Sequence, residues 1–312
     1  MTDAEQRAVL TLCLMAAVAD GNTDDRERAQ LKAVTDELGA AGGGELASVY
    51  EEVLLRKPTL AAVVRPLASP EARQHAYEAA VGVCNADGVT SAAESAFLAD
   101  LASALGLPAA SAQSIAQTGN ALAAAPLAAG TGDGTLVGAT PANAAELDKS
   151  ILNYSILNGA LELLPQSLAS MVIIPLQMKM VYGIGKAYGY ELDQGHVKDL
   201  LATMGVGLTG QYVEQFGRRI IGGLLGSIGG GLLRGMGSVA TGATFSFATT
   251  YALGQVAKRY YAGGRTIDAA GLKQAFSEML GQAKQLQGQY SGQIADKARN
   301  LDVNQLLATI RQ

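Results

Sequence analysis

The sequence predicts an all-α fold, and three features of its 312 residues support that prediction. Apolar residues make up 49% of the chain while aromatic residues make up only 5%, so most of the apolar content consists of small residues and Leu, which pack helices. Apolar side chains recur at helical spacing, and capping residues precede several of these stretches. Charged residues reach 16%, against roughly 25% in an average soluble domain. This composition excludes a disordered chain and is compatible with membrane contact.

Charge differs between the two halves of the chain. Residues 1–125 carry 8 Lys and Arg against 16 Asp and Glu, a net −8, whereas residues 126–312 carry 15 against 12, a net +3. Because a nucleic-acid-binding protein needs a concentrated basic face, no nucleic-acid partner is expected, whereas anionic lipid suits the second half. Residues 1–5 lack the basic start of a secretory signal, and Cys13 and Cys84 lie in apolar stretches. We therefore expect a cytoplasmic N-terminus with buried, reduced thiols.

An internal repeat with an offset of 67 residues organises the acidic part of the chain. Each copy predicts an apolar helix, at 9–19 and 76–86, then an Asp-Gly turn and a second helix that ends at Gly39 or Gly106. The matched pairs are Asp20 with Asp87, Gly21 with Gly88, Thr23 with Thr90, Glu27 with Glu94, Leu31 with Leu98, Leu38 with Leu105 and Gly39 with Gly106.

Helix caps account for the local chemistry after each turn. Ser91 and Glu94 have the spacing of a capping box, in which Ser accepts a hydrogen bond from the backbone and Glu reaches back to it. Asp24 and Glu27 have the same spacing in the first copy.

The two turn segments, residues 19–27 and 86–94, resemble the tellurite-resistance TerB-like family, and the resemblance extends over residues 5–118. It implies an all-helical, internally repeated module that is associated with membrane complexes and stress responses and that carries acidic metal-binding residues. It implies no particular activity.

A divalent cation is one hypothesis for the acidic turns. Oxygen-bearing residues alternate at the start of the first turn as in a calcium loop, but Asp25 and Leu31 stand where that loop requires Gly and a bidentate Glu, so neither copy is an EF-hand. If the two copies pack as a pair, their turns would pool carboxylates for Ca²⁺ or Mg²⁺, whereas turns and caps alone explain the same residues without a cation. The candidate ligands are Asp20, Asp24, Glu27, Asp87 and Glu94.

Composition also predicts the division into domains. Residues 121–147 are dominated by Ala, Gly, Thr and Pro and predict a flexible tether. Residues 151–178 are apolar but interrupted by Pro165 and Pro175, so they predict separate helical pieces. The expected segments are a TerB-like helical domain at 1–120, the tether at 121–147, an apolar Gly/Ala-rich helical domain at 148–265 and a C-terminal helical tail at 266–312.

Two charge-free runs, at 220–233 and 235–257, contain 14 and 23 residues. At about 1.5 Å per residue they would reach about 21 and about 34 Å, so only the second could span a hydrocarbon core of about 30 Å. Glycines at intervals of four would let membrane helices approach closely, although a tightly packed soluble bundle uses them in the same way. The expected packing glycines are Gly222, Gly226, Gly230, Gly231 and Gly235, and the expected lipid-flanking cations are Arg218, Arg219, Lys258 and Arg259.

Four short segments of the apolar half, residues 174–180, 188–189, 250–254 and 260–261, carry a second resemblance. They are similar to the YcjF-like family, over about residues 150–265. This resemblance implies an inner-membrane location and a small GTPase as partner. Residues 222–237 depart from the family's pattern of a helix break.

The C-terminal tail carries apolar residues that step alternately by four and three positions, which is a heptad seam. Its glycines weaken an isolated helix, so the seam needs a partner, either a second copy in a homo-oligomer or the protein's own helical body. The seam residues are Leu272, Phe276, Met279, Ala283, Leu286 and Tyr290.

Together these features favour a non-enzymatic scaffold or adaptor on the cytoplasmic side of a bacterial inner membrane, with a GTPase or stress-response complex as partner. Two alternatives stay open: an oligomeric helical pore or membrane-remodelling protein, and a soluble metal-responsive binding protein. An enzyme is the least favoured class, since the sequence contains two histidines and neither a phosphate loop nor a recognisable catalytic triad.

Overall fold

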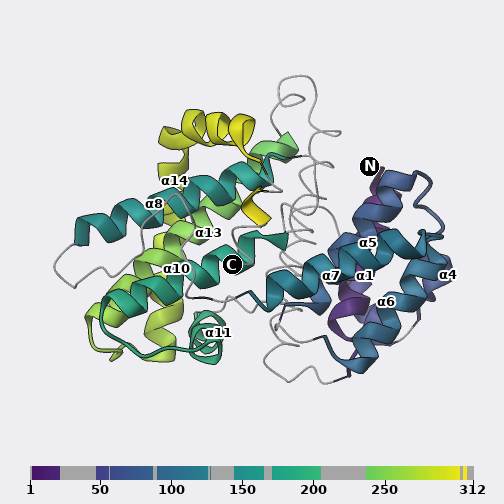
Figure 1. Cartoon of the computed structure of the whole chain (residues 1–312), viewed down its shortest axis with the longest axis horizontal. Helices are drawn as coiled ribbons and strands as arrows, with labels where there is room; N and C mark the ends of the chain where they lie inside the picture. The colour runs from purple at the N-terminus through teal and green to yellow at the C-terminus, as the bar shows by residue number, and fades with distance from the viewer. Residues whose placement is uncertain are drawn as a thin grey trace. The chain divides into compact units, whose positions relative to one another are not determined.

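The computed structural model describes residues 2–21, 47–55, 57–86, 90–125, 127, 144–164, 171–204, 237–302 and 305–307. Every regular element in these ranges is an α-helix, which confirms the predicted all-α fold (Figure 1). The chain divides into two compact units. Unit 1 comprises Met1–Ala124 with Gly207–Thr241, and unit 2 comprises Ala125–Val206 with Gly242–Gln312.

Unit 1 is built around two apolar helices that pack against each other, α1 and α5. Leu10, Leu12 and Leu14 are completely buried in α1, which also packs against α3, α4 and α6. The helices of unit 1 are α1 (Asp3–Ala17), α3 (Ala47–Leu54), α4 (Leu60–Val63), α5 (Pro70–Cys84), α6 (Ala92–Ala104) and α7 (Ala109–Ala123).

The internal repeat corresponds to this central pair, since α1 and α5 are the apolar helices of the two copies. Both begin six residues before the predicted starts at residues 9 and 76. The reason is local, because Thr2 forms a capping box with Glu5, and Ser69 caps a helix whose first residue is Pro70.

The predicted end of the second helix of the second copy is confirmed. Gly106 follows α6 with a φ of 64°, which glycine adopts without steric cost. Its N–H donates to the carbonyl of Ser103, and the Leu107 N–H donates to that of Ala102, the pattern of a Schellman motif.

Both cysteines of unit 1 are buried and unbridged, as expected from their apolar surroundings. Burial raises the pKa of the Cys13 thiol from its ordinary value of 9.0 to about 12. The thiolate form is therefore strongly disfavoured in the folded protein, and Cys13 serves as a packing residue.

Unit 2 is a bundle in which α10 and α14 pack against α8, and α11 packs against α10 and α14. The predicted interruption of 151–178 is confirmed, since α8 ends at Glu162 and α10 begins at Ile173. Pro175 lies in the first turn of α10, where its missing N–H removes no helical hydrogen bond. The helices of unit 2 are α8 (Ala144–Glu162), α10 (Ile173–Ala187), α11 (Gln194–Thr203), α13 (Gly237–Ala262), which belongs to this unit from Gly242 onward, and α14 (Ala269–Asn300).

Glycines bring α13 close to α8 along the core of unit 2. A Cβ added to Gly254 would lie 2.6 Å from Cγ2 of Ile151, closer than side chains can approach. Farther along α8, a Cβ on Gly159 would lie 3.3 Å from Cβ of Phe247. These close-packing glycines differ from the five that the sequence suggested, which lie outside the described residues.

Candidate functional site

The acidic turns of the repeat were the candidate cation site, and the structure describes two of the five expected ligands. Asp20 is half-buried in the turn that follows α1. Glu94 completes a capping box, in which its Oε2 accepts from the Ser91 N–H at 2.7 Å while its own N–H donates to Ser91 Oγ at 3.1 Å. Asp24, Glu27 and Asp87 lie outside the described residues.

The predicted capping box is therefore confirmed, and it gives the Glu94 carboxylate a structural role. Within the ranges that the structure describes, no group of three or more His, Cys, Asp or Glu side chains is arranged to hold a metal ion. The cation hypothesis stays untested, because three of its five residues are not described.

The apolar run at 235–257 was the candidate membrane span, and its described part lies in α13. From residue 243 onward its larger apolar side chains are buried inside unit 2: Phe247, Leu253 and Val256 are each completely buried. No helix among those described combines the length and the hydropathy needed to cross a bilayer. The proposed packing glycines Gly222, Gly226, Gly230, Gly231 and Gly235, together with Arg218 and Arg219, lie outside the described residues.

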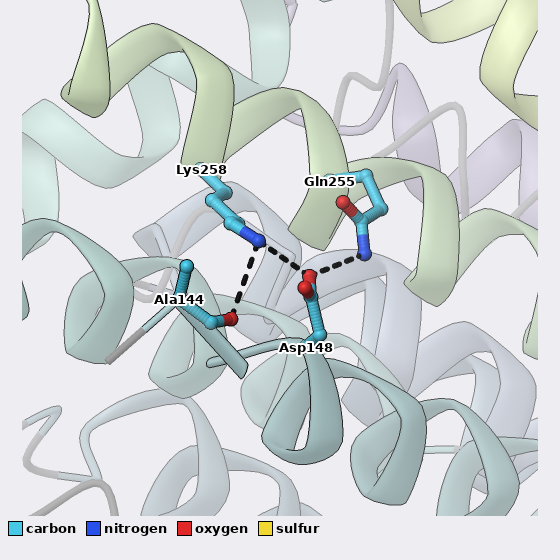
Figure 2. A network of polar contacts seen from close by, with 4 residues as sticks. All are labelled: Ala144, Asp148, Gln255 and Lys258. Carbon is cyan, nitrogen blue, oxygen red and sulfur yellow. Dashed lines mark hydrogen bonds and ion pairs between the residues drawn. The ribbon is translucent and has the colours of Figure 1, made fainter. Parts of the chain in front are cut away.

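Lys258, a predicted lipid-flanking cation, joins α13 to the start of α8 instead of extending into solvent (Figure 2). Its Nζ lies 2.6 Å from Oδ1 of Asp148 and donates to the carbonyl of Ala144 at 3.3 Å. Gln255, one turn earlier, donates from Nε2 to the same carboxylate oxygen at 3.0 Å. The Lys258 side chain is only 18% exposed. Its neighbour Arg259 is exposed.

A buried hydrogen-bond cluster joins α8, α10 and α13 in the core of unit 2. The Thr250 hydroxyl accepts from Asn158 Nδ2 at 2.9 Å and from Gln177 Nε2 at 3.0 Å, and it donates to the Ser246 carbonyl at 2.7 Å. This hydroxyl therefore uses its full capacity of one donor and two acceptors. The three side chains are each at most 1% exposed, so the bonds form away from water.

Two charged residues are also buried in unit 2. Glu162 at the end of α8 accepts a hydrogen bond from the Ser246 hydroxyl at 3.3 Å. Lys179 on α10 is 3% exposed, and its burial lowers the pKa of the ammonium group. Both residues therefore belong to the polar interior of the bundle.

The heptad seam of the tail is covered in large part by unit 2 itself. Leu272, Met279 and Ala283 are buried, and Tyr290 stacks on Phe247 of α13 with ring centroids 6.0 Å apart. The remaining seam residues, Phe276 and Leu286, are partly buried. The helix α14 therefore docks on its own chain. Binding of a second copy at the seam is a separate hypothesis.

Several of these residues were missed by sequence reasoning, namely Asp148, Asn158, Thr250 and Gln255. The signal was present, since each is a polar residue next to apolar ones that face the core. Their partners lie 73 to 110 positions away along the chain. These partners can therefore be identified only once it is known which helix faces contact each other.

Comparison with known proteins gives a family match for the first part of the chain. Residues 1–118 match a family described as "Protein of unknown function (DUF533)". That family is related to the TerB-like family, so the resemblance of the N-terminal region is supported. The chain has no significant match among curated proteins or solved structures. The matched residues fall within the N-terminal segment of unit 1, the part that carries the repeat.

Proposed function

We propose that the protein is a non-enzymatic scaffold or adaptor at the cytoplasmic face of a bacterial inner membrane. The observation that carries this proposal is the division of the chain into two compact helical units, the first of which contains the DUF533 match. Two units with separate cores offer two independent binding surfaces on one polypeptide. A scaffold uses that arrangement to bring two partners together.

Unit 2 would receive a membrane-linked partner in this proposal. The sequence of residues 150–265 is similar to the YcjF-like family, which suggests a small GTPase as that partner and self-association as a second property. Lys258, Asp148 and Thr250 all have structural partners inside the unit, and we assign them to the stability of the bundle.

Membrane attachment is proposed for the segment at 218–233. The basic pair Arg218 and Arg219 precedes 14 residues without charge, a combination that suits the surface of an anionic bilayer. The second apolar run is a weaker candidate, because its described part lies in the core of unit 2.

Fractionation of cells that express the full chain tests the attachment. The test variant replaces Leu224, Leu225, Ile228, Leu232 and Leu233 by Ser. The control variant, Leu54→Ser/Leu55→Ser, removes two large apolar residues that are 44% and 64% exposed on unit 1.

The wild type and the control should sediment with membranes and withstand a high-salt wash, since salt screens charge but does not remove inserted apolar side chains. The test variant should move to the soluble fraction. A wild type that is soluble, or a test variant that sediments like the wild type, would reject membrane attachment. The scaffold role would then have to be tested separately from membrane attachment.

A further inference from the structure

One pocket of unit 2 is lined by charged side chains of both signs. It has a volume of about 170 Å³ and lies where α11, the end of α13 and the start of α14 meet. His196, Asp199 and Thr203 line it from α11, and Tyr260 and Arg265 line it from the end of α13 and the turn that follows. A cavity of about 150 Å³ accommodates benzene, so this pocket suits a ligand of comparable size.

Arg265 is an exposed cation at the pocket, and two tyrosine rings lie beside its guanidinium group. Its guanidinium carbon lies 5.8 Å from the ring centre of Tyr190 and 6.0 Å from that of Tyr260, and its Nε donates to the Tyr260 hydroxyl at 3.4 Å. Tyr190 is itself held, since its hydroxyl donates to the Tyr261 carbonyl at 3.3 Å.

The Arg265 backbone is unusual as well. Its φ is 63°, in the left-handed region that favours glycine, and the preceding Gly264 has a φ of 70°. Glycine would occupy position 265 at lower steric cost. An arginine in this conformation is consistent with a requirement for its side chain.

The remaining donors of Arg265 are available to a ligand. Among the described residues, none accepts a hydrogen bond from its two terminal nitrogens, and none pairs with the carboxylate of Asp199, which also lines the pocket. The two opposite charges therefore line the same small pocket without forming an ion pair with each other. A guanidinium with two free nitrogens matches the geometry of a carboxylate, and a carboxylate such as Asp199 attracts an ammonium group.

His196 completes the polar lining in a fixed orientation. Its Nδ1 lies 2.8 Å from Oδ1 of Asp193, the residue that caps α11. Since the Asp193 carboxylate accepts at Nδ1, the other ring nitrogen, Nε2, is the one left for a ligand.

We propose that this pocket binds a small zwitterion of the α-amino-acid type, with its carboxylate on Arg265 and its ammonium group on Asp199. A simple anion would be repelled by Asp199, and a simple cation by Arg265. The proposal is independent of membrane attachment and of scaffolding, because it concerns residues of unit 2 alone.

Calorimetric titration of the full-length protein tests it. The probes are glycine, L-alanine and L-serine, with propionate and ethylammonium as the single-charge analogues of alanine and inorganic phosphate as a further anion. At least one amino acid should bind saturably, with a Kd about tenfold or more below those of the single-charge probes, because it alone satisfies both charges.

Two variants remove one charge each, Arg265→Gln and Asp199→Asn. Each should raise the Kd of the amino acid by about tenfold or more, whereas the controls Arg259→Gln and Glu278→Gln change exposed charges outside the pocket and should leave it unchanged. Circular dichroism checks that the variants fold. Asp199→Asn keeps the test decisive if Arg265→Gln does not fold, because the Asp199 carboxylate has no partner among the described residues.

Three results would each overturn the proposal: no saturable binding by any of the three amino acids, an unchanged Kd in Asp199→Asn, or binding of propionate or phosphate as tight as that of the amino acids.

Discussion

In unit 1, several polar side chains bond to the ends of helices near the surface, whereas unit 2 places polar side chains between helices at full burial. Ser69 and Ser91 accept hydrogen bonds from the first turns of α5 and α6. Asn158, Gln177 and Thr250 bond to one another in the centre of the bundle. The comparison teaches that polar residues can position a helix boundary, as these caps of unit 1 do, or position whole helices against one another, as the core cluster of unit 2 does.

The largest effect is expected from Thr250→Val, which keeps the shape of the side chain but removes the hydroxyl. The substitution leaves the Asn158 and Gln177 amide donors buried without this acceptor, so the free energy of unfolding should fall by about 2–4 kcal/mol. Urea denaturation measures the loss, and hydrogen exchange assigns it to unit 2.

Thr203→Val is the matched control, because the Thr203 hydroxyl also donates to a carbonyl four residues earlier, while no buried amide from the described part of the chain donates to it. Thr203→Val should change the free energy of unfolding by no more than about 0.5 kcal/mol. Equal losses in the two variants would show that the buried cluster adds nothing beyond the helical bond.

The next largest effect is expected from Gly254→Ala. The new methyl group would lie 2.6 Å from Ile151 Cγ2, and such overpacking typically costs about 1–3 kcal/mol. Gly281→Ala is the control, because a Cβ there meets nothing within 4 Å. By helix propensity it should stabilise the protein by up to about 1 kcal/mol. Thermal unfolding should show a lower Tm for Gly254→Ala and a higher Tm for Gly281→Ala. A stabilising Gly254→Ala would contradict the close approach of α8 and α13.

Ser91→Ala tests the role of polar residues in unit 1. Loss of the N-cap should cost about 1 kcal/mol, and amide exchange should accelerate in the first turn of α6. Ser95→Ala, four residues later on an exposed position of the same helix, removes a hydroxyl without a capping role. If both variants exchange alike, the capping box does not stabilise the helix start.

The smallest effect is expected from Lys258→Met. The ion pair with Asp148 is partly solvated, so its removal should cost less than about 1 kcal/mol and the loss should shrink at high salt. Arg259→Met changes the exposed neighbour and should have no salt-dependent effect. A loss for Lys258→Met that is the same at low and high salt would indicate lost packing of its aliphatic stem and not lost charge.

The same contrast explains how much could be predicted from the sequence. The capping box at Ser91 and the helix end at Gly106 were predictable, because they depend on residues within about four positions. The start of α1 at Asp3 was missed, although Thr2 and Glu5 carried the same signal.

The core of unit 2 was not predictable in this way. The pairing of Lys258 with Asp148 joins residues 110 positions apart, and the sequence does not state which face of α13 meets α8. The sequence predicts Lys258 as a lipid-flanking cation, and it gives no sign of the contact with Asp148. The same apolar composition suits either a lipid or a protein environment, so only the arrangement of the helices reveals what surrounds the described part of the run.

The saturated hydroxyl of Thr250 has a consequence for the mechanics of the bundle. Large buried side chains such as Phe247 and Leu253, together with the close approach of Gly254 to Ile151, already limit how far α13 can slide. Turning α13 about its axis would in addition break the bonds that the Thr250 hydroxyl accepts from α8 and α10. A single hydroxyl therefore links three helices, so that a rotation of one is opposed by the other two.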